Sequence, residues 1–153
     1  MSLTVQSPVT GVVVGLDDVP DPVFSGRIVG PGVAVIPDRA AGDNVSALAP
    51  ISGTVSKIHP HAYVITHDDG RSFLVHLGLD TVSLAGAGFT VHASEGAALE
   101  AGDPVISFSP DRIEAEGLSP VVPVVALDAG ESDLVLAPPG TALSPKMTAF
   151  TWA

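Results

Sequence analysis

Hydrophobic residues along this chain fall in short runs rich in β-branched side chains, and Gly, Pro, Asp or Asn bounds each run. Short apolar runs between turn residues are typical of β-strands. The predicted strands are GVVVGL (11–16), GVAVIP (32–37), GTVSKI (53–58), AYVIT (62–66), SFLVHL (72–77), DPVISF (103–108), VVPVVAL (121–127) and DLVLAPP (133–139). We therefore predict an all-β fold of the sandwich or barrel type.

Helical patterns are weak and short. The segment DRIEAEG (111–117) begins at an aspartate and ends at a glycine, which predicts about two turns of helix. The segment GLDTVSLAG (78–86) has room for a single turn. Helices are thus expected only as short connections between strands.

A faint internal repeat runs through the chain. SPVTGVV (7–13) resembles APISGTV (49–55), and APPGT (137–141) repeats the beginning of both. Each copy places a proline-led turn before a glycine and a strand, which indicates related β-motifs within one domain. The length of 153 residues also fits one domain, so we expect a single domain over 1–153. Met1–Leu3 fit a leader added ahead of the domain, and we assign them no structural role.

The chain is acidic, with 6 basic and 17 acidic side chains and a formal net charge of −11. The basic residues are scattered and comprise Arg27, Arg39, Lys57, Arg71, Arg112 and Lys146. Because no basic stripe is available to neutralise phosphates, we expect no nucleic-acid binding, and anionic membranes would repel the chain. A basic protein partner would be attracted to it.

The chain has no cysteine, so neither a disulfide framework nor a thiolate site is possible. This composition fits a reducing cytosol. The N-terminal residues show no signal-peptide pattern, and the longest apolar run (121–127) is too short to span a bilayer. We expect a cytoplasmic protein that does not span a membrane.

Four of the five histidines lie within residues 59–81. There, AYVIT and SFLVH flank HDDG, and Asp-Gly is a strong hairpin signal. A two-residue loop at 68–69 or at 69–70 places His61 and His76 on the same face of the sheet, with their Cβ atoms roughly 4.5–8 Å apart. A three-residue loop would place them on opposite faces.

A two-residue loop would put Tyr63, Ile65 and Leu74 on the face that carries the histidine pair. Burial in such an apolar setting favours the neutral imidazole, which can act as a nucleophile, a base or a metal ligand. The alternative for either histidine is a half-buried strand residue with one hydrogen bond. The residues alone leave both interpretations open.

For the other three histidines we expect simpler roles. We expect His67 to be solvated at the hairpin turn and His92 to be an ordinary strand or surface residue. His59 is either a turn residue or a partner that supports His61.

Asp80 follows His76 by four residues and also has two interpretations. A carboxylate at this spacing can orient an imidazole or stabilise its charge. Asp is also a common N-cap residue, and Asp80 could cap a short turn that begins beside Thr81. The sequence pattern does not choose between them.

Several segments together resemble the glucose-type IIA components of the bacterial phosphoenolpyruvate-dependent sugar phosphotransferase system. VHLGLDTV (75–82) and HPHAYVI (59–65) resemble the two histidine motifs of that family. Further similar segments, in the family's order, are DDVPDPVFSGRIVGPGVAV (17–35), LAPISGTVSKI (48–58), LAGAGF (84–89), GDPVISF (102–108) and SPVVPVVAL (119–127). The resemblance covers residues 4–152, and the combination of motifs in this order is highly specific.

The resemblance implies an antiparallel β-sandwich with two histidines side by side in a shallow, mostly apolar depression. It implies that His76 is phosphorylated on Nε2 and that His61 contacts the phosphoryl group without carrying it. Asp80 matches an acidic position near the active histidine. Phe24 and Tyr63 match apolar positions at the partner-binding face.

The resemblance also implies the partners of a phosphocarrier. The phosphocarrier protein HPr would donate a phosphoryl group to His76, and a IIB cysteine would receive it for sugar uptake and phosphorylation. We expect a monomer and no metal or other cofactor. One position departs from the family: His59 stands where many members have a threonine whose hydroxyl hydrogen-bonds a site histidine, so its role is open.

Two other functions deserve comparison. His59 and His61 form an H-x-H motif, and His76 and Asp80 form an H-x-x-x-D motif, which are the zinc motifs of LytM-type peptidases. Those peptidases place the two motifs in the reverse order and act on cell walls, whereas this chain shows no export signal. The remaining alternative is a purely regulatory binding module that recognises transporters or enzymes.

Overall fold

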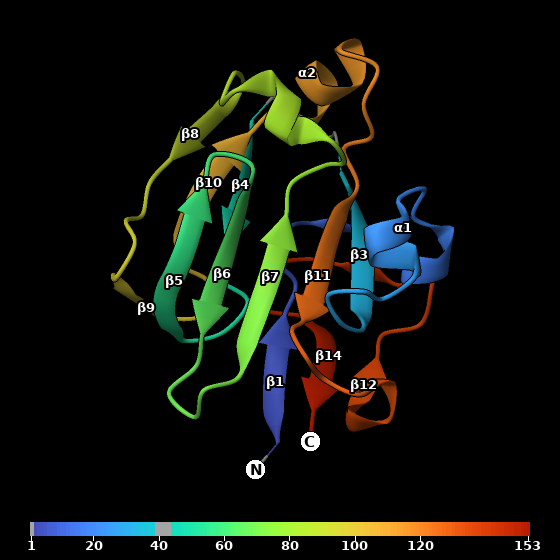
Figure 1. The fold of residues 1–153 in the computed structure, drawn as a ribbon, viewed down its shortest axis with the longest axis vertical. Coiled ribbons are helices and arrows are strands. Elements are labelled where there is room, and N and C mark those ends of the chain that lie inside the picture. Colours follow the sequence, from blue (N-terminus) through green and yellow to red (C-terminus); the bar gives the residue numbers. More distant parts are fainter. Residues whose placement is uncertain (1, 39–43) are drawn as a thin grey trace.

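The computed structural model describes residues 2–38 and 44–153, and strands dominate it (Figure 1). The strands are β1 (Leu3–Gln6), β2 (Gly11–Gly15), β3 (Gly32–Pro37), β4 (Val45–Leu48), β5 (Gly53–His59), β6 (Ala62–Thr66), β7 (Ser72–His76), β8 (Phe89–Val91), β9 (Ala98–Leu99), β10 (Pro104–Phe108), β11 (Val122–Ala126), β12 (Leu134–Leu136), β13 (Ala142–Leu143) and β14 (Thr148–Trp152). The helical segments are α1 (Pro22–Ser25) and α2 (Pro110–Ala115), with 3₁₀ turns η1 (Leu16–Asp18), η2 (Thr81–Leu84) and η3 (Glu131–Asp133). The predicted all-β fold with only short helical turns is confirmed.

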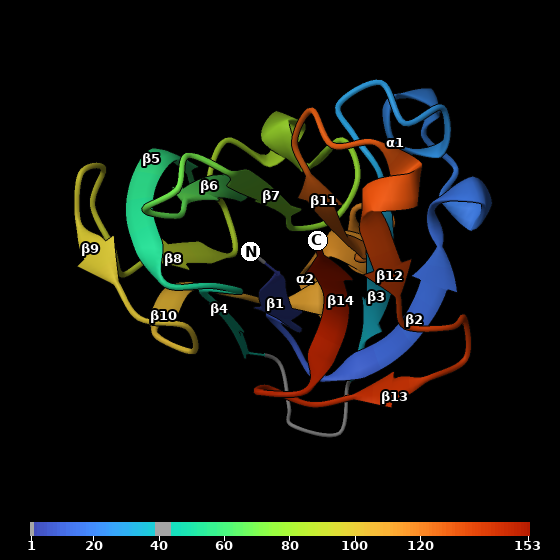
Figure 2. The same cartoon turned by 90° about the horizontal axis from the view of Figure 1, so that it is seen from below.

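Within the part of the chain that the structure describes, the strands form three antiparallel sheets. The large sheet has eight strands in the order β13-β2-β3-β11-β7-β6-β5-β9, and the two smaller sheets are β1-β14-β12 and β4-β10-β8. In Figure 1 the central strands of the large sheet, from β5 to β3, face the viewer, with α1 beside β3 and α2 at the top. Figure 2 shows that the large sheet curves around β1 and β14. The smaller sheets therefore close the inner side of the large one.

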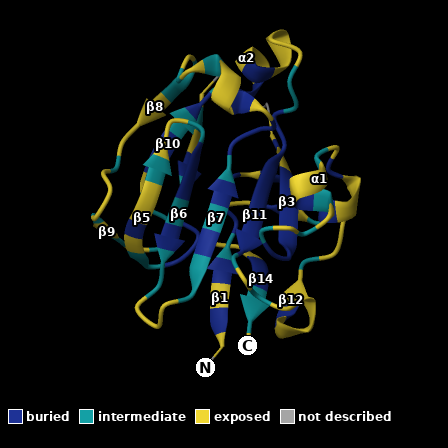
Figure 3. Ribbon diagram, viewed as in Figure 1, coloured by how far each residue is buried: buried dark blue, intermediate teal, exposed yellow. Residues whose placement is uncertain are grey.

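The large sheet is covered on both faces near its centre. Its inner face contributes Phe73 and Val75 of β7 to the main hydrophobic core. Its outer face carries a second cluster, here called the outer core, made of Leu16, Val19, Phe24, Ala34, Leu79, Val121 and Val125. Figure 3 accordingly shows β3 and β11 buried along most of their length, beside a largely exposed α1. The outer core fixes the chain around η1 and α1 to the sheet.

The β6–β7 hairpin differs from both predicted registers. Ala62 pairs with His76 and Thr66 with Ser72, and the His67 amide donates to the Arg71 carbonyl (2.8 Å). The loop is therefore the three residues 68–70, closed by Gly70 at φ +93°. The two-residue loop was the wrong prediction because Asp-Gly also suits a three-residue loop with glycine in the left-handed position.

The internal repeat has a physical basis in two of its three copies. Gly11 begins β2 and Gly53 begins β5. A Cβ added at Gly11 would lie 2.0 Å from the Ile36 carbonyl oxygen, and one at Gly53 would lie 2.3 Å from that of Thr66. Both glycines thus allow a neighbouring strand to approach closely. Gly140, in the third copy, has open space around it at φ +89° and serves as a turn residue.

The N-terminal residues have a structural role that the sequence did not reveal. Leu3 is 6% exposed, belongs to the main core and pairs with Trp152 of β14. The expectation that Met1–Leu3 play no structural part is therefore wrong for Leu3, and Met1 lies outside the described residues. Pairing of β1 with β14 places the two ends of the chain side by side (Figure 1).

Tyr63 lies on the inner face of the large sheet, with 1% of its surface exposed. The expectation that it contributes to a partner-binding face is wrong, because the three-residue hairpin loop turns Tyr63 and Ile65 into the main core and leaves Leu74 on the side of His76. The Tyr63 hydroxyl donates to the Leu48 carbonyl (2.7 Å). Burial raises the pKa of Tyr63 well above its ordinary value, so the hydroxyl keeps its proton.

The Tyr63→Phe variant tests this structural role. Loss of the hydroxyl leaves the Leu48 carbonyl without its donor, so the free energy of unfolding should fall by about 1–2 kcal/mol. Urea denaturation measures the change. An unaltered free energy of unfolding would show that this hydrogen bond does not stabilise the fold.

Candidate active site

His76 ends β7 and projects from the outer face of the large sheet, where it is half-buried. The ring of Phe24, carried by α1, meets the His76 ring edge-on at 5.3 Å between centroids. On another side, the His61 ring lies 5.2 Å away at an interplanar angle of 71°. The predicted histidine pair is thus present. The His76 ring is carried by β7 and is contacted from α1 and from the turn between β5 and β6.

His61 reaches His76 from a turn and not from a strand. Residues 60–61 form the connection between β5 and β6, so strand alternation does not fix the direction of the His61 side chain. The backbone still extends the ladder, because the Leu77 amide donates to the His61 carbonyl (2.8 Å). This explains how the two rings meet even though a three-residue loop would separate them on a regular hairpin.

The proton position on His76 follows from its hydrogen bond. Nδ1 lies 2.5 Å from the Gly78 carbonyl oxygen. A carbonyl oxygen only accepts, so Nδ1 carries the hydrogen and donates it. In the neutral ring, Nε2 then holds a lone pair and is the nucleophilic nitrogen.

Gly78 is held rigidly in a conformation that favours glycine. Its φ is +82°, and an added Cβ would lie 2.7 Å from Thr81 Cγ2 and 2.9 Å from the Ser119 carbonyl oxygen. Its own amide donates to the Val121 carbonyl (3.0 Å). The Gly78 carbonyl is therefore a fixed acceptor that orients the His76 ring.

The environment keeps both histidines neutral near pH 7. Burial lowers the pKa of His76, while the Gly78 carbonyl and the charges of Asp21 and Asp80 partly oppose that shift. Burial also lowers the pKa of His61, and the neighbouring rings of His76 and His59 add to the effect. Both rings are therefore uncharged and available as a nucleophile or a hydrogen-bonding group.

The pair lies in a shallow depression of about 260 Å³. Its lining consists of Asp21, Val23, Phe24, Val29, His61, Leu74, His76, Asp80 and Val82. Val82 is 67% exposed and Val23 is 40% exposed, so the rim presents apolar surface to solvent. A site of this shape suits contact with a protein surface better than enclosure of a small molecule.

Asp80 and Asp21 supply the charge of the depression. Asp80 occupies the N-cap position of η2 at φ +59°, but its side chain makes no capping hydrogen bond. Asp21 caps α1, accepting a hydrogen bond from the Val23 amide (2.9 Å). The prediction that Asp80 caps this turn is therefore wrong for its side chain. The hydrogen bond that orients the His76 ring is accepted by the Gly78 carbonyl. Sequence reasoning missed Asp21, although Asp before Pro is a helix-start signal.

The remaining histidines lie apart from the reacting nitrogen. His59 stacks on His61, with centroids 5.8 Å apart and an interplanar angle of 25°. His67 is half-buried rather than fully solvated, with Nδ1 2.8 Å from the Ser52 carbonyl. His92 is exposed at the end of β8 and bonds the Ser107 hydroxyl (2.7 Å), as expected for a surface residue.

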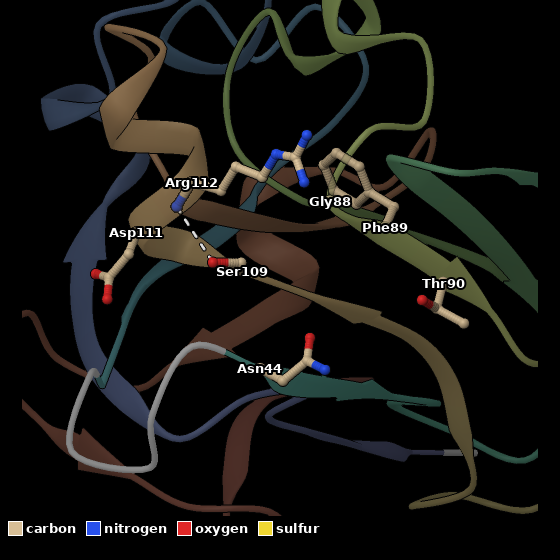
Figure 4. Close-up of a pocket in the computed structure, with 7 residues that line it drawn as sticks. All are labelled: Asn44, Gly88, Phe89, Thr90, Ser109, Asp111 and Arg112. Atoms are coloured by element: carbon tan, nitrogen blue, oxygen red, sulfur yellow. Dashed lines mark hydrogen bonds between the residues drawn. The ribbon is translucent and has the colours of Figure 1, made fainter.

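A larger hollow of about 680 Å³ lies between β8 and α2, and neither His61 nor His76 lines it (Figure 4). Its lining residues are Asn44, Gly88, Phe89, Thr90, Ser109, Asp111 and Arg112. The Ser109 hydroxyl accepts a hydrogen bond from the Arg112 amide (3.2 Å) and so caps α2. None of these residues is an activated nucleophile. The depression around His76 is therefore the more suitable site for a reaction.

The zinc interpretation has no support from the geometry. Within residues 2–38 and 44–153, His, Cys, Asp and Glu side chains form no group of three placed to hold a metal ion. The H-x-H and H-x-x-x-D residues therefore do not converge as a ligand set.

Lowered histidine pKa values predict a pH dependence of stability. The unfolded chain binds protons on His76 and His61 near the ordinary value of 6.5, whereas the folded protein binds them only at lower pH. The free energy of unfolding should thus be fully maintained above about pH 6.5 and decline as the pH falls toward the folded-state pKa values. Urea denaturation from pH 7.5 to 5 checks this. The free energy of unfolding of a His76→Gln variant should decline less over this pH range. An equal decline in both proteins would contradict the lowered pKa of His76.

Comparisons with known proteins show which family this chain is similar to. Residues 3–131 match the family model described as phosphoenolpyruvate-dependent sugar phosphotransferase system, EIIA 1. The chain is 39% identical over 133 residues to the PTS system glucose-specific EIIA component of Bacillus cereus, and equally to that of Bacillus anthracis; each alignment covers 84% of this chain and 78% of the relative. The corresponding component of Oceanobacillus iheyensis is 37% identical over 125 residues, covering 80% and 73%.

Structural similarity extends over nearly the whole chain. The glucose permease IIA from Mycoplasma capricolum superimposes with a TM-score of 0.88 at 29% identity, covering 99% of this chain and 96% of that one. In the described residues, no helix has the length and apolar character needed to cross a membrane.

Proposed function

Since this chain belongs to the EIIA type 1 family of the phosphoenolpyruvate-dependent sugar phosphotransferase system and is a phosphocarrier of the glucose type, we propose that His76 carries the phosphoryl group on Nε2. The observation that carries this proposal is the hydrogen bond from Nδ1 to the Gly78 carbonyl, which leaves the Nε2 lone pair free. The depression around His76 is open to a partner that brings the phosphoryl group.

The donor is phospho-HPr. The Nε2 lone pair of His76 attacks phosphorus in line, the bond from phosphorus to the donor histidine breaks, and its electron pair returns to the donor ring. Positioning and charge stabilisation account for most of the rate in phosphoryl transfer. As the His76 ring gains positive character, the Gly78 carbonyl stabilises the Nδ1–H.

The shape and charge of the site suit a basic donor surface. Val23 and Val82 provide apolar contact at the rim, while Asp21 and Asp80 make the depression negative. The net charge of −11 also attracts a basic partner from solution. These features favour rapid encounter without a deep pocket.

His61 acts on the phosphoryl group without carrying it. Its ring lies against that of His76 and projects into the same depression. A dianionic phosphoryl group on His76 favours the protonated form of His61, which then donates a hydrogen bond to a phosphoryl oxygen. The group then passes to a cysteine of the IIB component in the cytoplasm, and sugar uptake and phosphorylation follow.

Reconstitution of the relay tests the proposal. The chain is incubated with phosphoenolpyruvate, enzyme I and HPr, and then with IIB. We expect one acid-labile phosphoryl group per chain, no labelling when HPr is omitted, and loss of the label once IIB is added. Absence of labelling in the complete mixture would refute the proposed function.

A further inference from the structure

We propose that His59 is a positioning residue for phosphoryl transfer, and that its ring holds the His61 ring against His76 by stacking. This inference rests on the proposed function of His76, and it assigns a role to the histidine that the sequence left unexplained. His59 would act through His61, without touching the phosphoryl group.

The described residues place four rings in a row on the outer surface of the sheet. Phe24 contacts His76 at 5.3 Å, His76 contacts His61 at 5.2 Å, and His61 contacts His59 at 5.8 Å between centroids. The interplanar angles are 62°, 71° and 25°. His76 thus has edge contacts on two sides, whereas His61 has an edge contact with His76 and a stacked contact with His59.

Besides its edge contact with His76, the His61 ring depends on the stack with His59 for its orientation. It is half-buried and lies in a turn, whereas His76 also has the Gly78 carbonyl to orient it. The second side-chain torsion of histidine is broad, so a ring without a flat contact samples many orientations. A stacked partner narrows that range and keeps one His61 nitrogen directed at the phosphoryl position.

The hairpin turn makes the stack rigid. His59 ends β5 and pairs with Ala62 of β6, so its backbone is fixed by the sheet. Pro60, whose own φ is restricted, lies against Gly86: a Cβ added at Gly86 would meet Pro60 Cγ at 3.5 Å. The turn therefore presents His59 and His61 as one preformed unit.

The size of the expected effect follows from the stacked contact between His59 and His61. An aromatic pair contributes enough energy to change a rate about three- to tenfold.

Two substitutions separate stacking from other roles of His59. The His59→Ala variant removes the ring, the His59→Phe variant keeps an aromatic face without nitrogen atoms, and His92→Ala serves as a control at an exposed histidine elsewhere. We expect His59→Ala to lower the maximal rate of transfer from His76 to IIB about three- to tenfold with little change in KM. His59→Phe should restore most of that rate.

A second measurement does not depend on phosphorylation. Ring order of His61 in the unphosphorylated protein, measured by side-chain NMR relaxation, should fall in His59→Ala and be retained in His59→Phe and His92→Ala. The inference is wrong if His59→Ala keeps the wild-type ring order of His61 and the wild-type rate of transfer to IIB. It is also wrong if His59→Phe loses as much ring order and rate as His59→Ala does. If wild-type protein accepts no phosphoryl group, the proposed function fails, while ring order still decides the positioning role.

Discussion

Replacing Gly78 by alanine is expected to lower the free energy of unfolding by about 2–4 kcal/mol and to reduce phosphorylation of His76 at least about tenfold. The new Cβ would lie 2.9 Å from the Ser119 carbonyl oxygen and 2.7 Å from a methyl carbon of Thr81, at a φ of +82°. The segment must shift, and the Gly78 carbonyl that holds His76 Nδ1 shifts with it. Urea denaturation and the initial rate of labelling by phospho-HPr measure the two effects.

Gly70→Ala is the matched control. Gly70 has φ +93°, but an added Cβ would meet no atom of the described residues within 4 Å. This variant should show only the cost of a left-handed alanine, about 1–2 kcal/mol, with labelling unchanged. If Gly78→Ala were no less stable than Gly70→Ala and were labelled normally, the carbonyl of Gly78 would not be orienting His76.

The second large effect is expected from His61→Ala. Acceptance of the phosphoryl group from HPr should persist, because His76 Nε2 and its Gly78 contact remain. Transfer onward to IIB should fall by about 10²–10³, the usual loss when one donor to a developing charge is removed. Rapid-quench measurement of both steps checks the separation.

The interpretation of His61 fails if both steps run at the wild-type rate. It also fails if acceptance and onward transfer are lost together in a protein that remains folded. The His92→Ala variant is a suitable control, since His92 bonds Ser107 outside the site.

The strands were predictable because each apolar run is flanked by turn residues, and this local signal is strong in β2, β5 and β11. The register of the β6–β7 hairpin could not be predicted, because Asp69-Gly70 supports a loop of either two or three residues. A slip of one residue then exchanges the two faces of the sheet. Tyr63 was misplaced for that reason. The two histidine rings still meet, as predicted, because His61 lies in the turn before β6 and its direction does not depend on the register.

The rest of the site depends on contacts between distant segments. The helix α1 is too short for a periodic pattern, and its position comes from packing of Phe24 in the outer core. Asp21 reaches the depression only because α1 lies there. The orienting acceptor for His76 is a backbone carbonyl, and no residue type in the sequence identifies such a group.

Phosphorus–nitrogen NMR correlation of the ¹⁵N-histidine-labelled chain, phosphorylated with phosphoenolpyruvate, enzyme I and HPr, identifies the nitrogen that carries the phosphoryl group. We expect one phosphorus coupled to Nε2 of His76, and no phosphohistidine signal in His76→Ala. A phosphorus coupled to a nitrogen of His61, or full labelling of His76→Ala, would show that His76 is not the carrier.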